Sequence, residues 1–197
     1  MLPLEVVFFM LLLIWGMAGV VRGFSREVGA TIAIALAMTA VRIFGPLAVQ
    51  YYNKLAGKVA ASYQIPIAAS VPANTNPFCA AVSQEQFIFY SIAFLAIVFM
   101  GYQGETFSVP VPFNKVTGSV AGFFVGVLNG YLIAGNLWYF LDRCAMYDVP
   151  RLGLNHVGVL SPTAQTIVKI LPLNTVLGEP IVLLGLLFLL LILRIAK

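Results

Sequence analysis

Five long apolar segments, separated by polar or proline-rich stretches, dominate the pattern along the chain. A helix rises about 1.5 Å per residue, so about 20 mostly apolar residues cross the roughly 30 Å hydrocarbon core of a bilayer. The runs predict membrane-spanning helices over residues 2–21, 28–44, 86–102, 116–141 and 180–195. The last run is slightly short, but a bilayer can thin locally around such a helix. We therefore expect an all-α, polytopic helical membrane protein with about five transmembrane helices in one domain, residues 1–197.

The second apolar run is expected to bend or end at Gly45-Pro46, because proline lacks a backbone N–H and obstructs the preceding helical turn. Beyond it, apolar residues recur every four positions, at Tyr51, Leu55, Val59 and Tyr63. This stripe predicts either a short amphipathic helix at the membrane interface or the continuation of the second span past its bend. A second short amphipathic helix is predicted after Ser161, as its N-cap, and before Pro172, which ends it.

Composition narrows the class of protein. Of the 197 residues, 61% are hydrophobic and 9% are charged, whereas soluble domains carry about 25% charged residues. Charged residues are too few to cover a water-exposed surface, so most of the surface must face lipid. The net charge is +4, but the 11 lysines and arginines are scattered singly, mostly beside apolar runs. Such residues mark the ends of membrane spans and form no basic patch for nucleic acid.

The segment GVVRGFSREVG, residues 19–29, concentrates charge between the first two apolar runs. A charge at the centre of a bilayer is costly, so Arg22, Arg26 and Glu27 are expected at the headgroup surface, in the turn of a helical hairpin. Under the positive-inside rule this turn lies in the cytoplasm and the N-terminus lies outside. Two interpretations stay open: the turn only sets the orientation, or it also belongs to a specific motif.

The hexapeptide RGFSRE, residues 22–27, followed by a span rich in small residues, resembles the hairpin motif of the colicin V production protein (CvpA) family. The segment GFFVGVLNG, residues 122–130, is similar to the glycine-ridged fourth helix of that family. The likeness covers roughly residues 1–141. It implies a place in the bacterial cytoplasmic (inner) membrane as an envelope factor without an agreed biochemical activity. It also implies a hairpin motif made of Arg22, Gly23, Phe24, Arg26 and Glu27.

The chain differs from the family pattern in three features. Asn129 stands on the glycine ridge where the family commonly has an arginine. Lys115 precedes the ridge, one turn away from the usual basic residue. The family typically has four spans, so the run at 180–195 is an addition. The resemblance therefore implies more about the fold than about a mechanism.

Four glycines recur every fourth residue in the 116–141 run, at Gly118, Gly122, Gly126 and Gly130. A helix face without side chains can approach another backbone closely, which is one way in which membrane helices associate. We expect this helix-packing face, with Asn129 beside it, to contact either another helix of the same chain or another subunit. Asn129 and Asn136 are expected either to form hydrogen bonds between helices or to line a polar pathway.

Residues able to bind metals or cofactors are few and scattered. His156 is the one histidine and lies outside every predicted span, and the two cysteines, Cys79 and Cys144, lack metal-site spacing. The cysteines fall in connections on the same predicted side of the membrane, so they form either a disulfide or unpaired buried thiols. We predict no metal site and no cofactor.

No arrangement typical of an active site is recognised. Asp142 and Asp148 are interpreted as solvated loop residues, and Ser161 as a helix cap rather than a nucleophile. We therefore predict that the chain is not an enzyme. Three functions stay open: a CvpA-like scaffold or assembly protein of the cell envelope, an accessory subunit of a larger respiratory or photosynthetic complex, or a small transporter or channel. The expected partners are the lipid bilayer and either other membrane subunits or a second copy of the chain, without nucleic acid.

Overall fold

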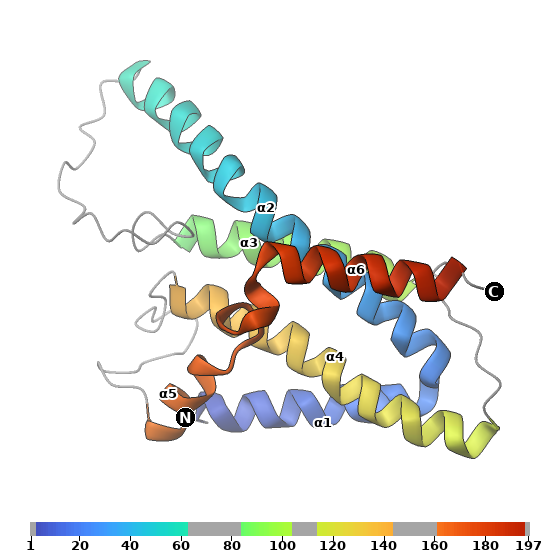
Figure 1. The fold of residues 1–197 in the computed structure, drawn as a ribbon. Coiled ribbons are helices and arrows are strands. Elements are labelled where there is room, and N and C mark those ends of the chain that lie inside the picture. The colour runs from blue at the N-terminus through green and yellow to red at the C-terminus, as the bar shows by residue number, and fades with distance from the viewer. Residues whose placement is uncertain (1–2, 63–83, 104–113, 144–160, 196–197) are drawn as a thin grey trace.

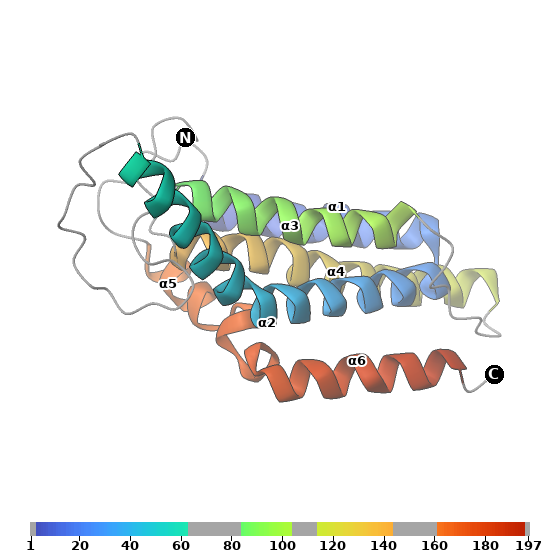
Figure 2. The ribbon, with the colours of Figure 1, turned by 90° about the horizontal axis from the view of Figure 1, so that it is seen from above.

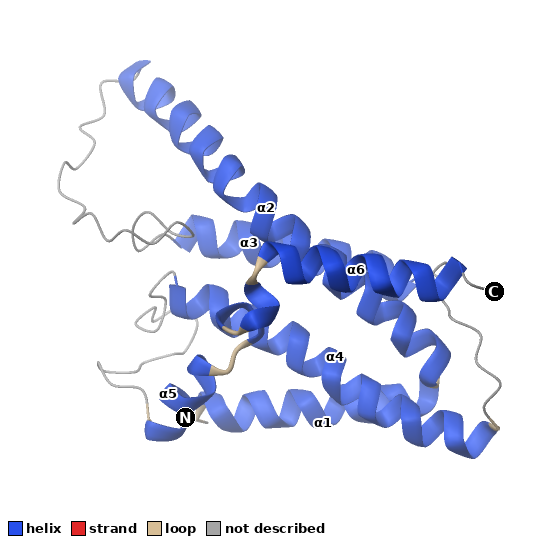
Figure 3. Cartoon of the chain, in the orientation of Figure 1, coloured by secondary structure: helices blue, strands red, loops and turns tan. Residues whose placement is uncertain are grey.

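The computed structural model describes residues 3–62, 84–103, 114–143 and 161–195 (Figure 1), and all regular secondary structure within these ranges is helical (Figure 3). The long helices are α1 (Leu4–Arg22), α2 (Phe24–Ser62), α3 (Gln84–Gln103), α4 (Lys115–Arg143) and α6 (Pro180–Ile195). Between α4 and α6 lie the short helix α5 (Pro162–Lys169) and two 3₁₀ turns, η3 (Pro172–Asn174) and η4 (Val176–Gly178). The all-α prediction is confirmed for this part of the chain.

The ends of α1, α3, α4 and α6 lie within two residues of the predicted segments. Within the described ranges, three helical segments are long and apolar enough to cross a membrane: Leu4–Arg22, Phe24–Gly45 and Val116–Asp142. Two shorter apolar stretches are Phe87–Gln103 in α3 and Pro180–Leu189 in α6. The structure is therefore compatible with a helical membrane protein.

The outward faces of the helices carry large apolar side chains. Leu13 of α1, Phe124 of α4 and Phe188 of α6 are each more than half exposed. A soluble protein rarely exposes large contiguous apolar patches, whereas the hydrocarbon core of a bilayer solvates them. These faces are suited to contact with lipid or with other apolar helices.

α2 differs from the predicted second span at both ends. It begins at Phe24 rather than near residue 28, and it continues to Ser62 without an interruption at Gly45 and Pro46. Figure 2 shows α2 changing direction near its midpoint. Gly45 and Pro46 lie close to the middle of its 39 residues. The expected bend is therefore present, because a proline inside a helix removes one backbone hydrogen bond and kinks the axis. Residues 51–62 continue α2, and the alternative of a separate interfacial helix is wrong.

The short helix α5 begins as the sequence predicts. Ser161 is its N-cap, and Ser161 Oγ accepts a hydrogen bond of 3.0 Å from the Ala164 backbone N–H. The same hydroxyl donates to Glu5 Oε1 at 2.8 Å. One side chain therefore caps α5 and joins it to the first turn of α1. The helix ends at Lys169, three residues before Pro172.

α4 is the central helix of the bundle and packs against α1, α2 and α3, while α6 runs along α2 (Figure 2). An aromatic cluster joins α3 to α4: Tyr90 stacks on Phe140 at 5.8 Å between ring centroids, and Phe94 meets the same ring edge-on at 5.9 Å. On the other side of α4, Phe8 of α1 meets Trp138 at 5.3 Å. The core is therefore built around the second half of α4.

The two ends of the bundle differ in the elements they contain. The break between α1 and α2, the end of α3, the start of α4 and the end of α6 lie together (Figure 1). We call this the Gly23 end. The start of α1, the end of α4 and α5 lie at the opposite end, which we call the α5 end (Figure 1).

Several sequence predictions fall outside the described residues. They concern the disulfide between Cys79 and Cys144, the position of His156, and the acidic residue Asp148. The side chain of Lys115 is also outside the description, although its backbone begins α4. They stay predictions from the sequence.

Candidate functional site

The break at Gly23 brings two charged residues together. α1 ends at Arg22, and Gly23 has a φ of 79°, a left-handed conformation that glycine adopts without steric cost. Its N–H closes α1 with a 2.8 Å bond to the Gly19 carbonyl, and α2 starts at the next residue. This sharp reversal lets the Arg22 side chain reach Glu27, five residues later and on a different helix.

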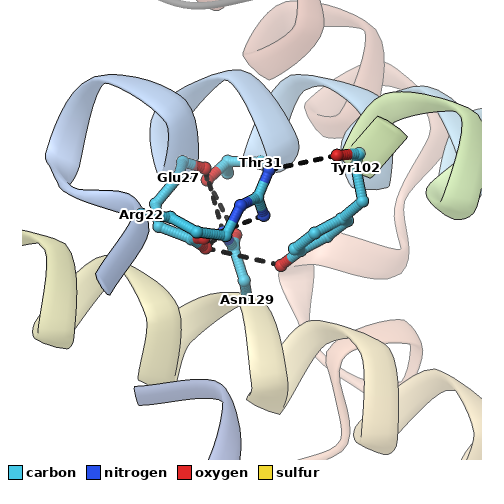
Figure 4. A network of polar contacts seen from close by, with 5 residues as sticks. All are labelled: Arg22, Glu27, Thr31, Tyr102 and Asn129. Atoms are coloured by element: carbon cyan, nitrogen blue, oxygen red, sulfur yellow. Dashed lines mark hydrogen bonds and ion pairs between the residues drawn. The ribbon is translucent and has the colours of Figure 1, made fainter. Parts of the chain in front are cut away.

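Glu27 is a fully buried acid in the first turn of α2 (Figure 4). Arg22 Nη1 donates to Glu27 Oε1 at 2.9 Å, and the side chains are 23% and 1% exposed respectively. The ion pair is therefore buried on the carboxylate side and partly open on the guanidinium side. The guanidinium of Arg22 also lies over an aromatic ring, since its Cζ is 4.3 Å from the centroid of Tyr102.

Asn129 of α4 holds the same carboxylate from a second direction. Its side-chain N–H₂ donates to Glu27 Oε2 at 2.8 Å and to the Glu27 backbone carbonyl at 2.9 Å. The other atom of the amide, Oδ1, accepts a 2.7 Å bond from the hydroxyl of Thr31, one turn further along α2. Asn129 is completely buried, and both ends of its amide are paired. It therefore joins α4 to two consecutive turns of α2.

Tyr102 closes the arrangement from α3. Its hydroxyl lies 3.4 Å from Glu27 Oε2, a long hydrogen bond, and its backbone carbonyl accepts from Arg22 Nη2 at 3.3 Å. Together, Arg22, Glu27, Thr31, Tyr102 and Asn129 join α1, α2, α3 and α4, and we call them the Glu27 cluster (Figure 4). The cluster lies at the Gly23 end of the bundle.

The hydrogen bonds of the Glu27 cluster hold four helices together. The carboxylate accepts hydrogen bonds from Arg22, Asn129 and Tyr102, so its charge is balanced and both of its oxygens are occupied. Removing one partner of a buried ion pair typically costs about 3–5 kcal/mol, because the remaining charge is left without compensation. The arrangement therefore favours one relative position of the four helices.

A glycine seam continues from the Glu27 cluster along α1 and α4. It consists of Gly16 and Gly19 on α1 and Gly122, Gly126 and Gly130 on α4. A Cβ added at Gly126 would overlap the Trp15 carbonyl oxygen and lie 3.1 Å from Gly19 Cα. A Cβ added at Gly130 would lie 2.8 Å from Trp15 Cβ, and one at Gly16 would lie 2.7 Å from Phe123 Cε2 and Val127 Cγ2. The two backbones are therefore in contact.

The glycine face of α4 contacts a helix of its own chain. Of the two partners considered, another helix of the same chain is the one that Gly122, Gly126 and Gly130 contact. Gly118 is partly exposed near the start of α4. Asn129 forms hydrogen bonds between helices, but Asn136 donates to the Leu132 carbonyl of its own helix. Its other amide atom, Oδ1, is buried without a hydrogen-bond partner among the described residues.

The prediction that the charged residues of the RGFSRE motif lie on the surface is wrong for Glu27. Arg26 is exposed, and Phe24 is half-buried, but Glu27 is in the interior. A buried carboxylate is unfavourable on its own, and a local pattern cannot reveal donors that come from residues 102 and 129. Its burial depends on these distant partners.

Sequence reasoning also missed several residues of the site. Thr31 and Tyr102 were not singled out, and neither were Gly16 and Gly19, which provide the α1 half of the glycine seam. Two signals were present. WGMAG, residues 15–19, carries small residues three apart, and isolated polar residues in apolar helices usually find each other.

Within the described ranges, no group of three or more His, Cys, Asp or Glu side chains converges on a possible metal position. Comparison with protein-family models, with curated protein sequences and with solved structures finds no match to this chain. The resemblance to the CvpA family therefore rests on the RGFSRE and GFFVGVLNG segments alone.

Proposed function

We propose that the chain is a non-enzymatic scaffold or assembly protein of the bacterial inner membrane, similar in role to the CvpA family, and that it crosses the membrane with five helices. α3, with 20 residues, and α6, with 16, would be the two shorter spans. At 1.5 Å per residue they measure about 30 Å and about 24 Å, so α6 requires a locally thinner bilayer. Both run alongside α2, which is long enough to cross.

The observation that carries the proposal is the second half of α2. After Gly45 and Pro46 the helix leaves the bundle and extends away from it as an arm, residues 47–62 (Figures 1 and 2). Tyr51 on this arm is 66% exposed. The apolar stripe and the lysines in the arm sequence suit a helix that docks on a partner at the membrane surface. A bundle fixed by the Glu27 cluster, with a projecting helix, suits a protein that holds another protein in place.

The Glu27 cluster favours a scaffold over a transporter or channel. Ionisable groups that move ions or protons exchange partners during the cycle. Glu27 instead has a fixed cation in Arg22, and Asn129 holds its second carboxylate oxygen. Its three side-chain partners, on α1, α3 and α4, would have to separate together before it could bind a solute.

Photocrosslinking from two positions tests the proposal. A photoreactive amino acid at Tyr51 should crosslink to one or a few membrane proteins at fixed stoichiometry after purification in mild detergent. The same group at Leu13, which is 58% exposed on α1, should crosslink mainly to lipid. Stoichiometric co-purification with large respiratory or photosynthetic subunits would instead assign the chain as an accessory subunit. Ion or solute flux in liposomes containing only this chain would overturn both assignments.

A further inference from the structure

An apolar groove lies between α1 and α3, with α4 as its floor. Its larger part is a cavity of 620 Å³ lined by Trp15 from α1, by Ile92, Leu95, Phe99 and Tyr102 from α3, and by Ile133 from α4. This volume is within the range of about 300–1,000 Å³ that is typical of ligand sites. A second cavity of 220 Å³ lies further toward the α5 end, between Phe8 of α1, Ser91 of α3 and Trp138 of α4.

The length of the larger cavity corresponds to one leaflet. It extends along α3 from Tyr102 to Ile92, ten residues, which is about 15 Å of helix. The hydrocarbon core of a bilayer is about 30 Å thick, so one leaflet contributes about 15 Å. An acyl chain that enters at the Gly23 end would therefore fill the cavity and end near the middle of the membrane.

The Gly23 end of the groove carries a cation with unused hydrogen-bond donors. The guanidinium of Arg22 lies over the ring of Tyr102, which lines the cavity. A guanidinium has five N–H donors, and Arg22 uses one toward Glu27 and one toward the Tyr102 carbonyl. Three donors therefore have no acceptor among the described residues, and the side chain is 23% exposed. A phosphate group can accept two parallel hydrogen bonds from a guanidinium.

The turn between α1 and α2, at the same end of the bundle, carries a net positive charge. Arg22 and Arg26 stand there against one carboxylate, Glu27. The two cations and one anion leave a net charge of +1. Anionic lipid headgroups are attracted to such a surface, and basic pockets between membrane helices bind them.

We propose that the groove between α1 and α3 binds one anionic glycerophospholipid from the leaflet at the Gly23 end. One acyl chain lies along Trp15, Leu95 and Phe99, and the phosphate accepts hydrogen bonds from Arg22. An uncharged occupant of the groove, including an apolar helix of a second copy, would leave those donors without an acceptor. Trp15 and Tyr102 provide the aromatic side chains that prefer the level of the headgroups.

Quenching of tryptophan fluorescence by brominated lipid measures this binding. The chain has two tryptophans, so Trp138→Phe leaves Trp15, at the groove, as the single reporter. The protein is reconstituted in vesicles in which either phosphatidylglycerol or phosphatidylcholine carries brominated acyl chains, at equal mole fractions. Phosphatidylglycerol should associate about fivefold more strongly, the preference expected for one basic residue at a headgroup.

Two variants on α3 test the position of the site. Ala96 is exposed and lines the cavity, so Ala96→Phe should fill the groove and abolish the preference for phosphatidylglycerol. Met100 is 66% exposed on the same helix and does not line the cavity, so Met100→Phe should retain the preference. Arg22→Gln should also abolish it. Loss of Arg22 leaves Glu27 without its cation, so Arg22→Gln can fail to fold. In that case Ala96→Phe decides the test.

Three results would overturn the proposal. Equal quenching by the two lipids would mean that bulk lipid fills the groove without recognition of the headgroup. Weak quenching by both would mean that protein, such as a second copy of the chain, covers the groove. An unchanged preference for phosphatidylglycerol in Ala96→Phe would mean that the lipid does not bind in the groove.

Discussion

The side-chain amide of Asn129 lies 2.8 Å from Glu27 Oε2 and 2.9 Å from the Glu27 backbone carbonyl, although the two residues are 102 positions apart. One amide group thus fixes both the side chain and the backbone of the first turn of α2 against α4. The RGFSRE hairpin and the glycine-rich helix α4 are therefore one structural unit.

The bond from Thr31 to Asn129 can be tested with a matched pair of substitutions. Thr31 and Thr39 both lie on α2, and the hydroxyl of each is near the carbonyl four residues earlier. Only Thr31 also bonds to Asn129 Oδ1, at 2.7 Å. Thr31→Val should lower the stability by about 1–3 kcal/mol, because it leaves a buried acceptor unpaired. Thr39→Val should cost less in thermal unfolding in detergent, and an equal loss would contradict the role of the bond.

The ion pair between Arg22 and Glu27 predicts a characteristic double-mutant cycle. Glu27→Leu and Arg22→Met should each destabilise the protein by about 3–5 kcal/mol, because each leaves one charge uncompensated. The double variant should be more stable than the sum of the two losses implies. Arg26→Met, at an exposed position in the same turn, should have a smaller effect. Additive losses in the cycle, followed by chemical denaturation in detergent, would show that the two residues act independently.

The glycine seam predicts different outcomes for two Gly→Leu substitutions. At Gly126 an added Cβ would overlap the Trp15 carbonyl, whereas at Gly185 of α6 it would meet no atom within 4 Å. Gly126→Leu should therefore separate α1 from α4 and lower the yield of folded protein, while Gly185→Leu is tolerated. Gel filtration and thermal stability in detergent measure both. Equal tolerance would mean that α1 and α4 are not in backbone contact in the membrane.

The orientation predicted from the positive-inside rule can be tested by cysteine labelling. Cys79 and Cys144 are first replaced by serine. A cysteine at Ser25, at the Gly23 end, should be protected from a membrane-impermeant thiol reagent applied to intact cells. A cysteine at Thr163, exposed on α5 at the opposite end, should react. The reverse pattern would place the N-terminus in the cytoplasm.

Local patterns in the sequence predicted most helices well, because each long apolar run forms one helix. They placed the bend of α2 near Pro46 but not its end, since nothing in residues 47–62 distinguishes a new helix from a continued one. Gly122, Gly126 and Gly130 were recognised by their spacing, whereas their partners Gly16 and Gly19 lack such a repeat. The burial of Glu27 could not be predicted, because Tyr102 and Asn129 supply its partners from far along the chain.

The distance in sequence between Glu27 and Asn129 also sets an order of events during synthesis. Chains grow at about 5–20 residues per second, so the 102 residues added after Glu27 to reach Asn129 take about 5–20 s to make. Once Ser62 has been added, the hairpin of α1 and α2 is complete, while α4, which begins at Lys115, does not yet exist. Arg22, five residues from Glu27, is the charged partner that is available from the start. A chain truncated before residue 114 should therefore depend on Arg22 for membrane insertion more strongly than the full-length chain, in which α4 later shares that task.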